Sequence, residues 1–400
     1  MPWVLATGPV RDEIGSHMKD VWRTEQEELD DWVKVVDRLP FVSSVKRDFN
    51  ALRRLLYDRR APRVVAVGAP GSGRTALANA LLHAMTFGDS GVMPAPDPGR
   101  WVHIDASGRR LDWMELPASE GEDALLELAR RGFEEQRPDL LLGVLEAGTE
   151  RDAGAKLKDA LQALQKHLDR DGDKAPVVIV VTKADGVPPG YVPLPYPQEK
   201  TQGIELALQS ARKTLAELGQ PDDAFLAASA LPNGDVSAPR YNVEAVGEAI
   251  VERLPEAAQL EAVRAFEVGR EARRRVGRAL VNSCSALAVT VGLAPIPFAD
   301  AFVLLPLQAA MVTGIAYLSG RPWDRKAASE WLASVGVVGG AGLGLRWGAQ
   351  QLAKLVPGAG SLVGAGVAGA GTLAIGRSAM AYFIDGPGRL DQQRPQLSAG

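Results

Sequence analysis

The feature that most constrains the fold of this chain is a glycine-rich octapeptide, GAPGSGRT, at residues 68–75. It follows an apolar run, RVVAV at 63–67, that predicts a strand, and it opens a segment, 75–86, that we expect to be helical. Glycines in such a strand–loop–helix let the backbone curl until successive amides and the helix N-terminus face one point. The octapeptide therefore predicts an α/β fold with a phosphate-binding loop, and an ordinary glycine-rich turn is the alternative.

The individual positions of this loop have expected roles. Arg74 stands where the P-loop pattern has lysine; it keeps the positive charge, but its planar guanidinium is bulkier than an ammonium and is expected to reach phosphates less well. The hydroxyl of Thr75 would bind Mg²⁺. The other residues expected around the phosphates are Gly68, Gly71, Ser72, Gly73 and Ala76.

Short apolar runs alternate with Ala-, Leu-, Glu- and Lys-rich stretches up to residue 254. This alternation predicts a doubly wound, mostly parallel sheet with helices on both faces. The expected strands are 63–67, 101–104, 112–116, 139–147, 176–181 and 224–229. The expected helices are 75–86, 122–136, 153–170, 198–218 and 242–254. The proline-dense segment 186–197 predicts a loop.

Two further motifs follow the fifth and sixth expected strands. Thr182, Lys183 and Asp185 form T-K-x-D, in which an aspartate can accept both donors of a guanine edge while the lysine stem covers the base. A solvated turn at the strand end is the alternative. Ser229 and Ala230 begin S-A-L, a match to an S-A-[KL] loop that supports the base through a backbone amide.

The order and spacing of these motifs make residues 60–254 resemble the Era-like branch of small P-loop GTPases. The resemblance implies GTP or GDP with Mg²⁺ as ligands. The family's D-x-x-G sensor of the γ-phosphate is replaced by Glu115-Leu116-Pro117-Ala118, and no threonine lies between Thr86 and Thr149 to serve as the switch-I threonine, which leaves Ser90 as the nearby hydroxyl. These departures favour nucleotide binding with weak or absent hydrolysis, and the motifs assign no catalytic base.

The composition changes after Leu254. A charged helix is expected over 256–278, and the stretches 279–299, 301–320 and 355–376 contain no charged residue. Residues 255–385 resemble a YcjF-like helical domain of unknown function, through the P-I-P-F-A-D run near 295–300 and a G-R-x-A-x-x-Y-F ending. We therefore expect an all-α, Gly/Ala-rich helical domain after the G domain, with amphipathic helices of 1–59 packed on it and a flexible tail at 386–400.

Whether the helical domain contacts a membrane is left open by the sequence. Each uncharged stretch approaches the length of a membrane span, and the spacings of Gly336, Gly340, Gly344 and of Gly360, Gly364 suit close helix packing in a bilayer. Prolines at 295, 297 and 306 and the charges of Arg346, Lys354 and Arg377 favour helical hairpins in a soluble bundle. The arginines Arg273, Arg274, Arg275 and Arg278 are interpreted as a solvated helix face, with an anionic-lipid anchor as the alternative. Asp300 is interpreted as a hairpin turn or N-cap, and Trp331, Trp347, Tyr382 and Phe383 as core or interface aromatics.

The net charge and the cysteine content restrict the cellular compartment and the binding partners that we expect. The net charge of −4 argues against nucleic-acid binding, although residues 271–400, with 12 Lys/Arg against 6 Asp/Glu, are basic. A single cysteine, Cys284, excludes an intramolecular disulfide, and the first twenty residues have no secretory apolar core. We therefore expect a bacterial cytoplasmic protein, with association with the inner membrane as an open alternative.

The leading functional hypothesis is a guanine-nucleotide-binding protein whose helical module, through residues 271–385, binds an anionic membrane surface or a protein partner, or forms a homo-oligomer. Two rivals remain. One is an active GTPase with unorthodox or partner-supplied switch elements, and the other is a nucleotide-free pseudo-GTPase scaffold.

Overall fold

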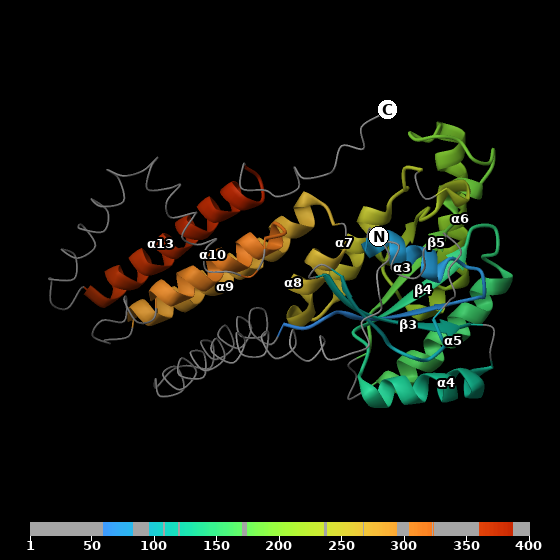
Figure 1. Ribbon diagram of the computed structural model, residues 1–400, viewed down its shortest axis with the longest axis horizontal. Coiled ribbons are helices and arrows are strands. Elements are labelled where there is room, and N and C mark those ends of the chain that lie inside the picture. The colour runs from blue at the N-terminus through green and yellow to red at the C-terminus, as the bar shows by residue number, and fades with distance from the viewer. Residues whose placement is uncertain are drawn as a thin grey trace, which may run out of the picture.

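The computed structural model of the chain describes residues 59–82, 96–106, 109–118, 121–169, 174–235, 238–266, 268–293, 304–321, 323 and 360–386. Figure 1 shows a sheet covered by helices on both faces and, to its left, the helices labelled α9, α10 and α13 side by side. Most of the N-terminal segment 1–59, Ser90, Asp300, Trp331, Trp347, the glycines at 336–344 and the end of the predicted tail lie outside the described residues.

Six strands form one sheet in the order β2-β3-β1-β4-β5-β6. They are β1 Arg63–Gly68, β2 Val102–Ala106, β3 Arg109–Pro117, β4 Leu140–Glu146, β5 Val177–Thr182 and β6 Phe225–Ala227. All neighbours are parallel except β2, which runs antiparallel to β3. The predicted doubly wound, mostly parallel sheet is confirmed. The antiparallel edge follows from the short β2–β3 connection, which cannot contain the crossover that parallel strands need.

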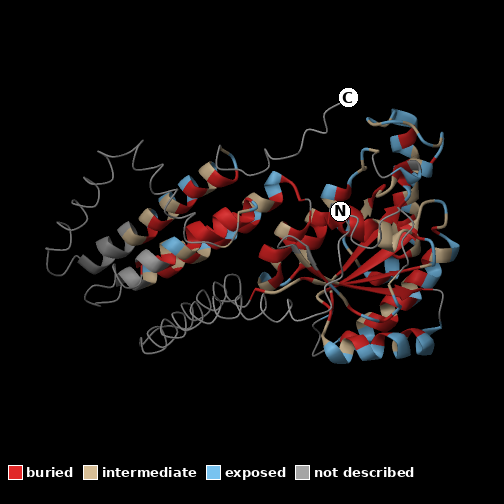
Figure 2. Ribbon diagram, in the orientation of Figure 1, coloured by how far each residue is buried: buried red, intermediate tan, exposed pale blue. Residues whose placement is uncertain are grey.

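The helices that cover the sheet lie at the predicted positions within a few residues. They are α3 Arg74–Leu82, α4 Glu122–Glu135, α5 Asp152–Leu168, α6 Gln198–Thr214 and α7 Val243–Arg253. Alternating residues of β1 divide the core between the two faces: Val64 and Ala66 join a cluster with α3, α7 and α8, and Val65 and Val67 join one with α4, α5 and α6. Figure 2 shows the resulting buried layer along the strands.

The predicted charged helix over 256–278 is wrong, because the structure has two helices there, α8 Glu256–Ala265 and α9 Arg270–Leu293. Phe266 and Val268, at the break, turn into the core and are almost fully buried. The backbone amide of Gly269 donates to Glu248 Oε1 of α7 at 3.1 Å. Burial of two apolar side chains and capping of α9 by α7 thus stabilise a turn that helical periodicity alone does not reveal.

The remaining helices, α10 Leu305–Leu318 and α13 Gly360–Phe383, pack with α9 into an elongated group. Glycines of α13 allow the close approach: a Cβ at Gly369 would lie 2.3 Å from Val289, and one at Gly376 would lie 2.5 Å from Val281. The C-terminal region is therefore helical, as predicted. Among the described residues, no helix is both long enough and apolar enough to cross a bilayer.

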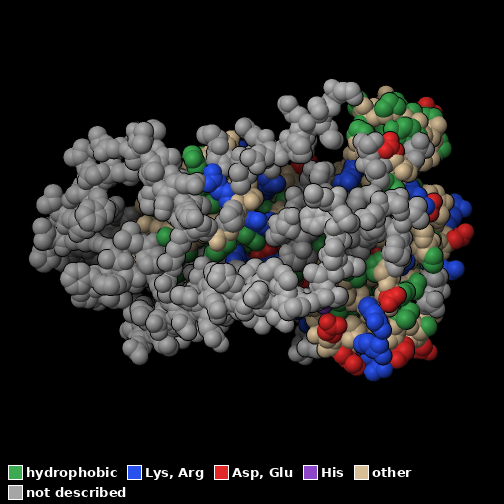
Figure 3. All heavy atoms as spheres, in the orientation of Figure 1, with side chains coloured by type: hydrophobic (Ala, Val, Ile, Leu, Met, Phe, Trp, Pro, Cys, Tyr) green, Lys and Arg blue, Asp and Glu red, His purple; other side chains and the backbone are tan. Residues whose placement is uncertain are grey.

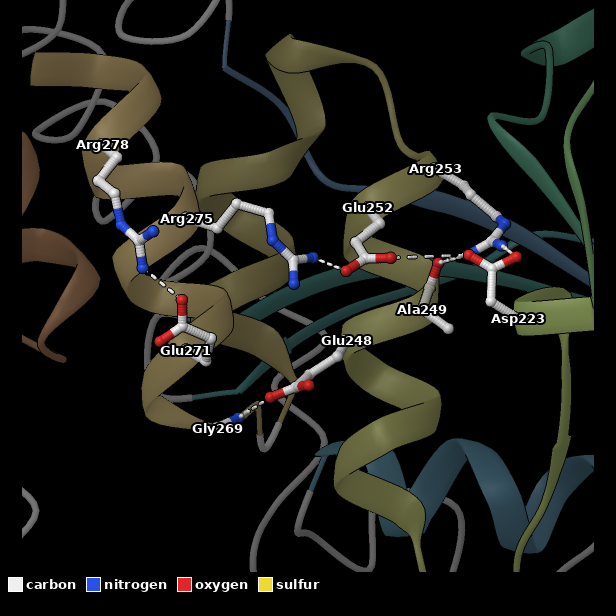
Figure 4. Close-up of polar contacts among 9 residues, drawn as sticks. All are labelled: Asp223, Glu248, Ala249, Glu252, Arg253, Gly269, Glu271, Arg275 and Arg278. Carbon is white, nitrogen blue, oxygen red and sulfur yellow. Dashed lines mark hydrogen bonds and ion pairs between the residues drawn. The ribbon is translucent and has the colours of Figure 1, made fainter. Parts of the chain in front are cut away.

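The arginines at the start of α9 have acidic partners. Arg275 pairs with Glu252 of α7 and Arg278 with Glu271, as Figure 4 shows, and Arg274 Nη2 lies 2.8 Å from Asp385 Oδ1. The pairs of Arg275 and Arg274 join α9 to α7 and to the residue after α13, whereas the pair of Arg278 lies within α9. The three side chains are 37–54% exposed, which is consistent with the predicted solvated helix face.

A second junction, centred on a buried glutamate, joins β3 to the helices α8 and α10. Glu261 of α8 has no exposed surface and lies 2.7 Å from Arg110 Nη2 of β3. The hydroxyl of Tyr317, in α10, donates to the Glu261 carboxylate at 2.9 Å. Burial, reinforced by that carboxylate, raises the pKa of Tyr317 to about 12. The guanidinium of Arg59 lies 3.8 Å from the same carboxylate and stacks on Trp323.

Candidate functional site

The predicted site residues converge at the carboxyl edge of the parallel strands. The glycine-rich loop begins at the last residue of β1, and Glu115 lies near the end of β3. The T-K-x-D motif begins at the last residue of β5, and Ser229 follows β6. This edge is where open parallel sheets bind ligands. Figure 3 shows charged side chains of both signs over the lower part of the α/β domain. On α4, Arg130 pairs with Glu127 and Glu134.

The glycine-rich loop has the backbone conformation that a phosphate cradle requires. Gly71 and Gly73 have φ values of +79° and +94°, which residues with a Cβ rarely adopt. The loop closes with a hydrogen bond from Ser72 N to Ala69 O at 3.1 Å, and α3 starts from the Gly73 carbonyl. Ser72 is 3% exposed, and its Oγ has no hydrogen-bond partner among the described residues. A buried hydroxyl without a partner is uncommon, and this one lies within the glycine-rich loop.

Arg74 lies against the protein rather than across the mouth of the loop. Its Nη1 donates to the Gly68 carbonyl at 2.9 Å and to the Leu116 carbonyl, and its Nε lies 3.4 Å from Glu115 Oε2. Burial lowers the pKa of this guanidinium, and the Glu115 carboxylate opposes that shift. The side chain therefore connects the glycine-rich loop to the end of β3, and its predicted contact with phosphate stays a prediction.

Glu115 is buried, 2% exposed, and accepts from neutral donors as well as from Arg74. Thr75 Oγ1 donates to its Oε1 at 2.8 Å, and Trp113 Nε1 donates to the same oxygen at 3.2 Å. The described residues contain no group of three His, Cys, Asp or Glu that could hold a metal. The Thr75 oxygen keeps lone pairs, so it fits a Mg²⁺ whose other ligands are phosphate oxygens and water.

The last residue of the E-L-P-A segment is engaged in the fold. The amide of Ala118 donates to the Gly68 carbonyl at 3.1 Å, and the residue is 3% exposed. This is the position at which the resemblance expected a glycine amide near the γ-phosphate. The amide could reach a phosphate only after this hydrogen bond breaks.

The T-K-x-D residues are joined to both neighbouring loops. Thr182 Oγ1 donates to the Ser72 carbonyl of the glycine-rich loop, and Ser229 Oγ donates to Asp185 Oδ1. Lys183 has a left-handed backbone, with φ of 54°, and its Nζ lies 2.8 Å from Glu146 Oε2 at the end of β4. The structure thus brings the three predicted motifs into one hydrogen-bonded set. Ala76 and Ala230 are partly buried beside it.

Some residues of the site were not predicted from the sequence. Glu146 could not be identified from the sequence, because it only ends an apolar strand. The rings of Tyr196 and Tyr241 pack with centroids 4.7 Å apart, but the two residues are 45 positions apart in the sequence, so their contact could not be predicted either. Lys200 is buried beneath the loop that follows Asp185. Its place at the start of a charge-rich helix resembles that of any solvated lysine, so the sequence held no signal for it.

Residues 257–399 match the model of a family described as "Domain of unknown function (DUF697)". Among curated proteins, "Magnetosome membrane protein 22" of Magnetospirillum gryphiswaldense is 33% identical over 106 residues, which is 25% of this chain and 53% of that protein. The chain thus spans about half the length of this relative. The family match agrees with the predicted C-terminal domain of unknown function.

The chain is also similar to several solved structures. They include Era in complex with MgGDPNP and 16S ribosomal RNA (16% identity, TM-score 0.33, 57% of this chain and 68% of that one) and Toc33 from Arabidopsis thaliana (18%, 0.35, 56% and 93%). The bacterial dynamin GTPase LeoA from ETEC is 11% identical, with a TM-score of 0.35, 80% of this chain and 69% of that one covered. The fold assignment rests on the strand order and loop geometry of the chain itself.

Proposed function

We propose that the chain binds a guanine nucleotide, GTP or GDP, at the carboxyl edge of its sheet, with weak or absent hydrolysis. The observation that carries the proposal is the hydrogen bonding of Thr182 to the glycine-rich loop and of Ser229 to Asp185. Through these two bonds a phosphate cradle and a base-reading carboxylate share one rigid frame. Such pre-organisation lowers the entropic cost of binding a ligand that spans both.

The phosphate end would be served by backbone amides of the loop, by the N-terminus of α3 and by Ser72 Oγ. Thr75 would hold Mg²⁺, which neutralises phosphate charge, and its hydrogen bond to Glu115 fixes the hydroxyl for that purpose. At the other end the Asp185 carboxylate would accept from N1–H and from the exocyclic amine of guanine, while adenine presents no such pair of donors. Lys183 would lie along the base.

Weak hydrolysis is supported by the state of the E-L-P-A segment. The Ala118 amide is bonded to Gly68, and Glu115 is engaged by Thr75, Trp113 and Arg74. A γ-phosphate would have to displace these contacts before it could move the segment. Slow turnover and similar affinities for GTP and GDP, within about tenfold, are therefore expected.

The test is a calorimetric titration of the full chain with GDP, GTP, ATP and XDP, repeated with Asp185→Asn and with Asp159→Asn, an exposed aspartate on α5, as control. The wild type and the control should prefer GDP over ATP, whereas Asp185→Asn should lose about 100-fold in GDP affinity, the value of two charge-assisted hydrogen bonds, and gain affinity for XDP. Equal affinity for ATP and GDP would falsify the proposal. If no nucleotide binds, the hypothesis of a nucleotide-free pseudo-GTPase scaffold is favoured. If the chain hydrolyses GTP through multiple turnovers and Thr75→Ala abolishes this activity, the hypothesis of an active GTPase is favoured.

For the helical module we propose association with an anionic membrane surface or a protein partner. The name of the magnetosome relative supports a membrane link, and the close packing through Gly369 and Gly376 supports a compact helical group. Flotation of the full chain with anionic and with zwitterionic liposomes tests it. A chain that remains at the bottom of both gradients contradicts the membrane part of this proposal.

A further inference from the structure

Lys200 is a buried ammonium that lies directly behind the predicted base-reading motif. It belongs to the first turn of α6 and has no exposed surface. Its Nζ donates to the carbonyl oxygens of Asp185 at 2.7 Å, Val187 at 2.8 Å and Gly190 at 2.6 Å. An ammonium has three N–H groups, so every donor is used. All three acceptors belong to the loop that begins at Asp185.

Aromatic and backbone contacts connect the ammonium to the other side of the same aspartate. Nζ lies 5.0 Å from the centroid of the Tyr196 ring, which packs on Tyr241. Tyr241 and Ser229 exchange two backbone hydrogen bonds, of 3.0 and 3.1 Å. Ser229 Oγ in turn donates to Asp185 Oδ1. Asp185 is therefore held through its backbone carbonyl by Lys200 and through its side chain by Ser229.

The packing of α6 against this loop leaves little room for other arrangements. One turn after Lys200, a Cβ on Gly203 would lie 2.8 Å from the Val187 side chain. Burial lowers the pKa of Lys200, while the negative charge of Asp185 opposes the shift. A charge placed in such a site is tolerated only where its hydrogen bonds are complete, as they are here.

We propose that Lys200 is a positioning residue for guanine recognition: by holding the carbonyls of Asp185, Val187 and Gly190 on one nitrogen, it fixes the Asp185 carboxylate where it can meet both donors of the base. The inference rests on the proposed function. It adds that base specificity depends on a side chain that does not touch the nucleotide.

The experiment measures the GDP:IDP affinity ratio by calorimetry for wild type and Lys200→Met. Inosine lacks the exocyclic amine of guanine, so the ratio reports how well Asp185 is placed. Wild type should prefer GDP by about tenfold or more, and Lys200→Met should bring the ratio to within about threefold. Affinity for inorganic tripolyphosphate, which needs only the loop, should stay within about twofold. Lys213→Met, an exposed lysine of the same helix, is the matched control.

Thermal unfolding monitors folding of each variant. Lys200→Met leaves three carbonyls without their donor, so a second variant is needed. Tyr196→Leu keeps the three hydrogen bonds of Lys200 and removes only the aromatic ring. It should lower the GDP:IDP affinity ratio by about threefold. If a folded variant of either kind keeps the wild-type ratio, or if GDP, IDP and tripolyphosphate weaken equally, Lys200 has no positioning role. A wild type that binds no guanine nucleotide overturns the proposed function instead.

Discussion

Each end of β3 carries an arginine–glutamate pair with a buried carboxylate, but the two pairs have different further partners. At the carboxyl end Glu115 meets Arg74 and two neutral donors, all within the α/β domain. At the amino end Arg110 pairs with Glu261, whose carboxylate also accepts from Tyr317 and lies near Arg59, so helices α8 and α10 take part. Figure 1 shows β3 leading from the helical region to the candidate site.

The two pairs differ in how easily their contacts can change. Glu261 is sealed and its charge has cationic partners from two sides, so this end fixes the helices to the sheet. Glu115 shares its oxygens with Thr75 and Trp113, and Arg74 has carbonyl acceptors besides, so we expect this end to rearrange more readily than the other. The same strand thus joins a permanent docking contact to an adjustable one, and substitutions at each end test this division.

The largest effect is expected at the sealed end. Glu261→Gln removes the charge that compensates Arg110 and Arg59 and should lower the free energy of unfolding by about 3 kcal/mol or more. Urea unfolding measures the loss, and Glu256→Gln, an exposed glutamate of the same helix, is the control. A loss below about 1 kcal/mol would show that the buried pair is not what fixes α8 to β3.

At the adjustable end the same substitution should cost less. Glu115→Gln keeps an oxygen that Thr75 and Trp113 can use, and Arg74 retains its two carbonyls, so the loss should be about 1–2 kcal/mol. GDP affinity should stay within about tenfold, since Thr75 keeps its place. Exposed Glu134→Gln serves as the control. A destabilisation as large as that of Glu261→Gln would remove the distinction between the two ends.

How far the sequence predicted this arrangement depends on the range of the interactions. The glycine-rich loop, the strands and T-K-x-D could be predicted because periodicity and motif spacing are local. The partners of Arg74, the Lys200 contacts and the Arg110–Glu261 pair could not, because each joins segments distant in sequence and uses residues common on solvated surfaces. The break at Phe266–Gly269 was missed for the same reason: tertiary burial of Phe266 and Val268 outweighs helix periodicity.

The substitution Arg74→Lys tests whether the side chain at position 74 mainly holds the protein carbonyls of Gly68 and Leu116 or binds phosphate. A lysine loses the fork that reaches the Gly68 and Leu116 carbonyls, so stability should fall by about 1 kcal/mol. Its compact ammonium can reach β- and γ-phosphates, so GTP and GDP should bind about two- to tenfold more tightly. Calorimetry and thermal unfolding give the two values, with Arg131→Lys, which is exposed on α4, as control. Weaker nucleotide binding would mean that the arginine itself contacts the phosphates.

The smallest effect is expected midway along β3, where Asp112 faces His103 on the antiparallel edge. His103 Nδ1 lies 2.7 Å from Asp112 Oδ1 and Nε2 lies 3.4 Å from Glu135 Oε1. The hydrogen bond to Asp112 raises the pKa of His103 above its ordinary value near 6.5. The folded state therefore binds the proton more tightly, so this contribution is fully present below about pH 6.5 and is lost as the pH rises through the raised value.

Exposure of the histidine limits the size of that contribution, since 58% of its side chain is in contact with solvent. We expect at most about 0.5 kcal/mol, seen as a pH-dependent difference in unfolding free energy between wild type and His103→Gln, measured from pH 5 to pH 8 in low salt. The two proteins should converge at the alkaline end. A difference that grows with pH would reverse the sign and show that the neutral imidazole, rather than its protonated form, is held between Asp112 and Glu135.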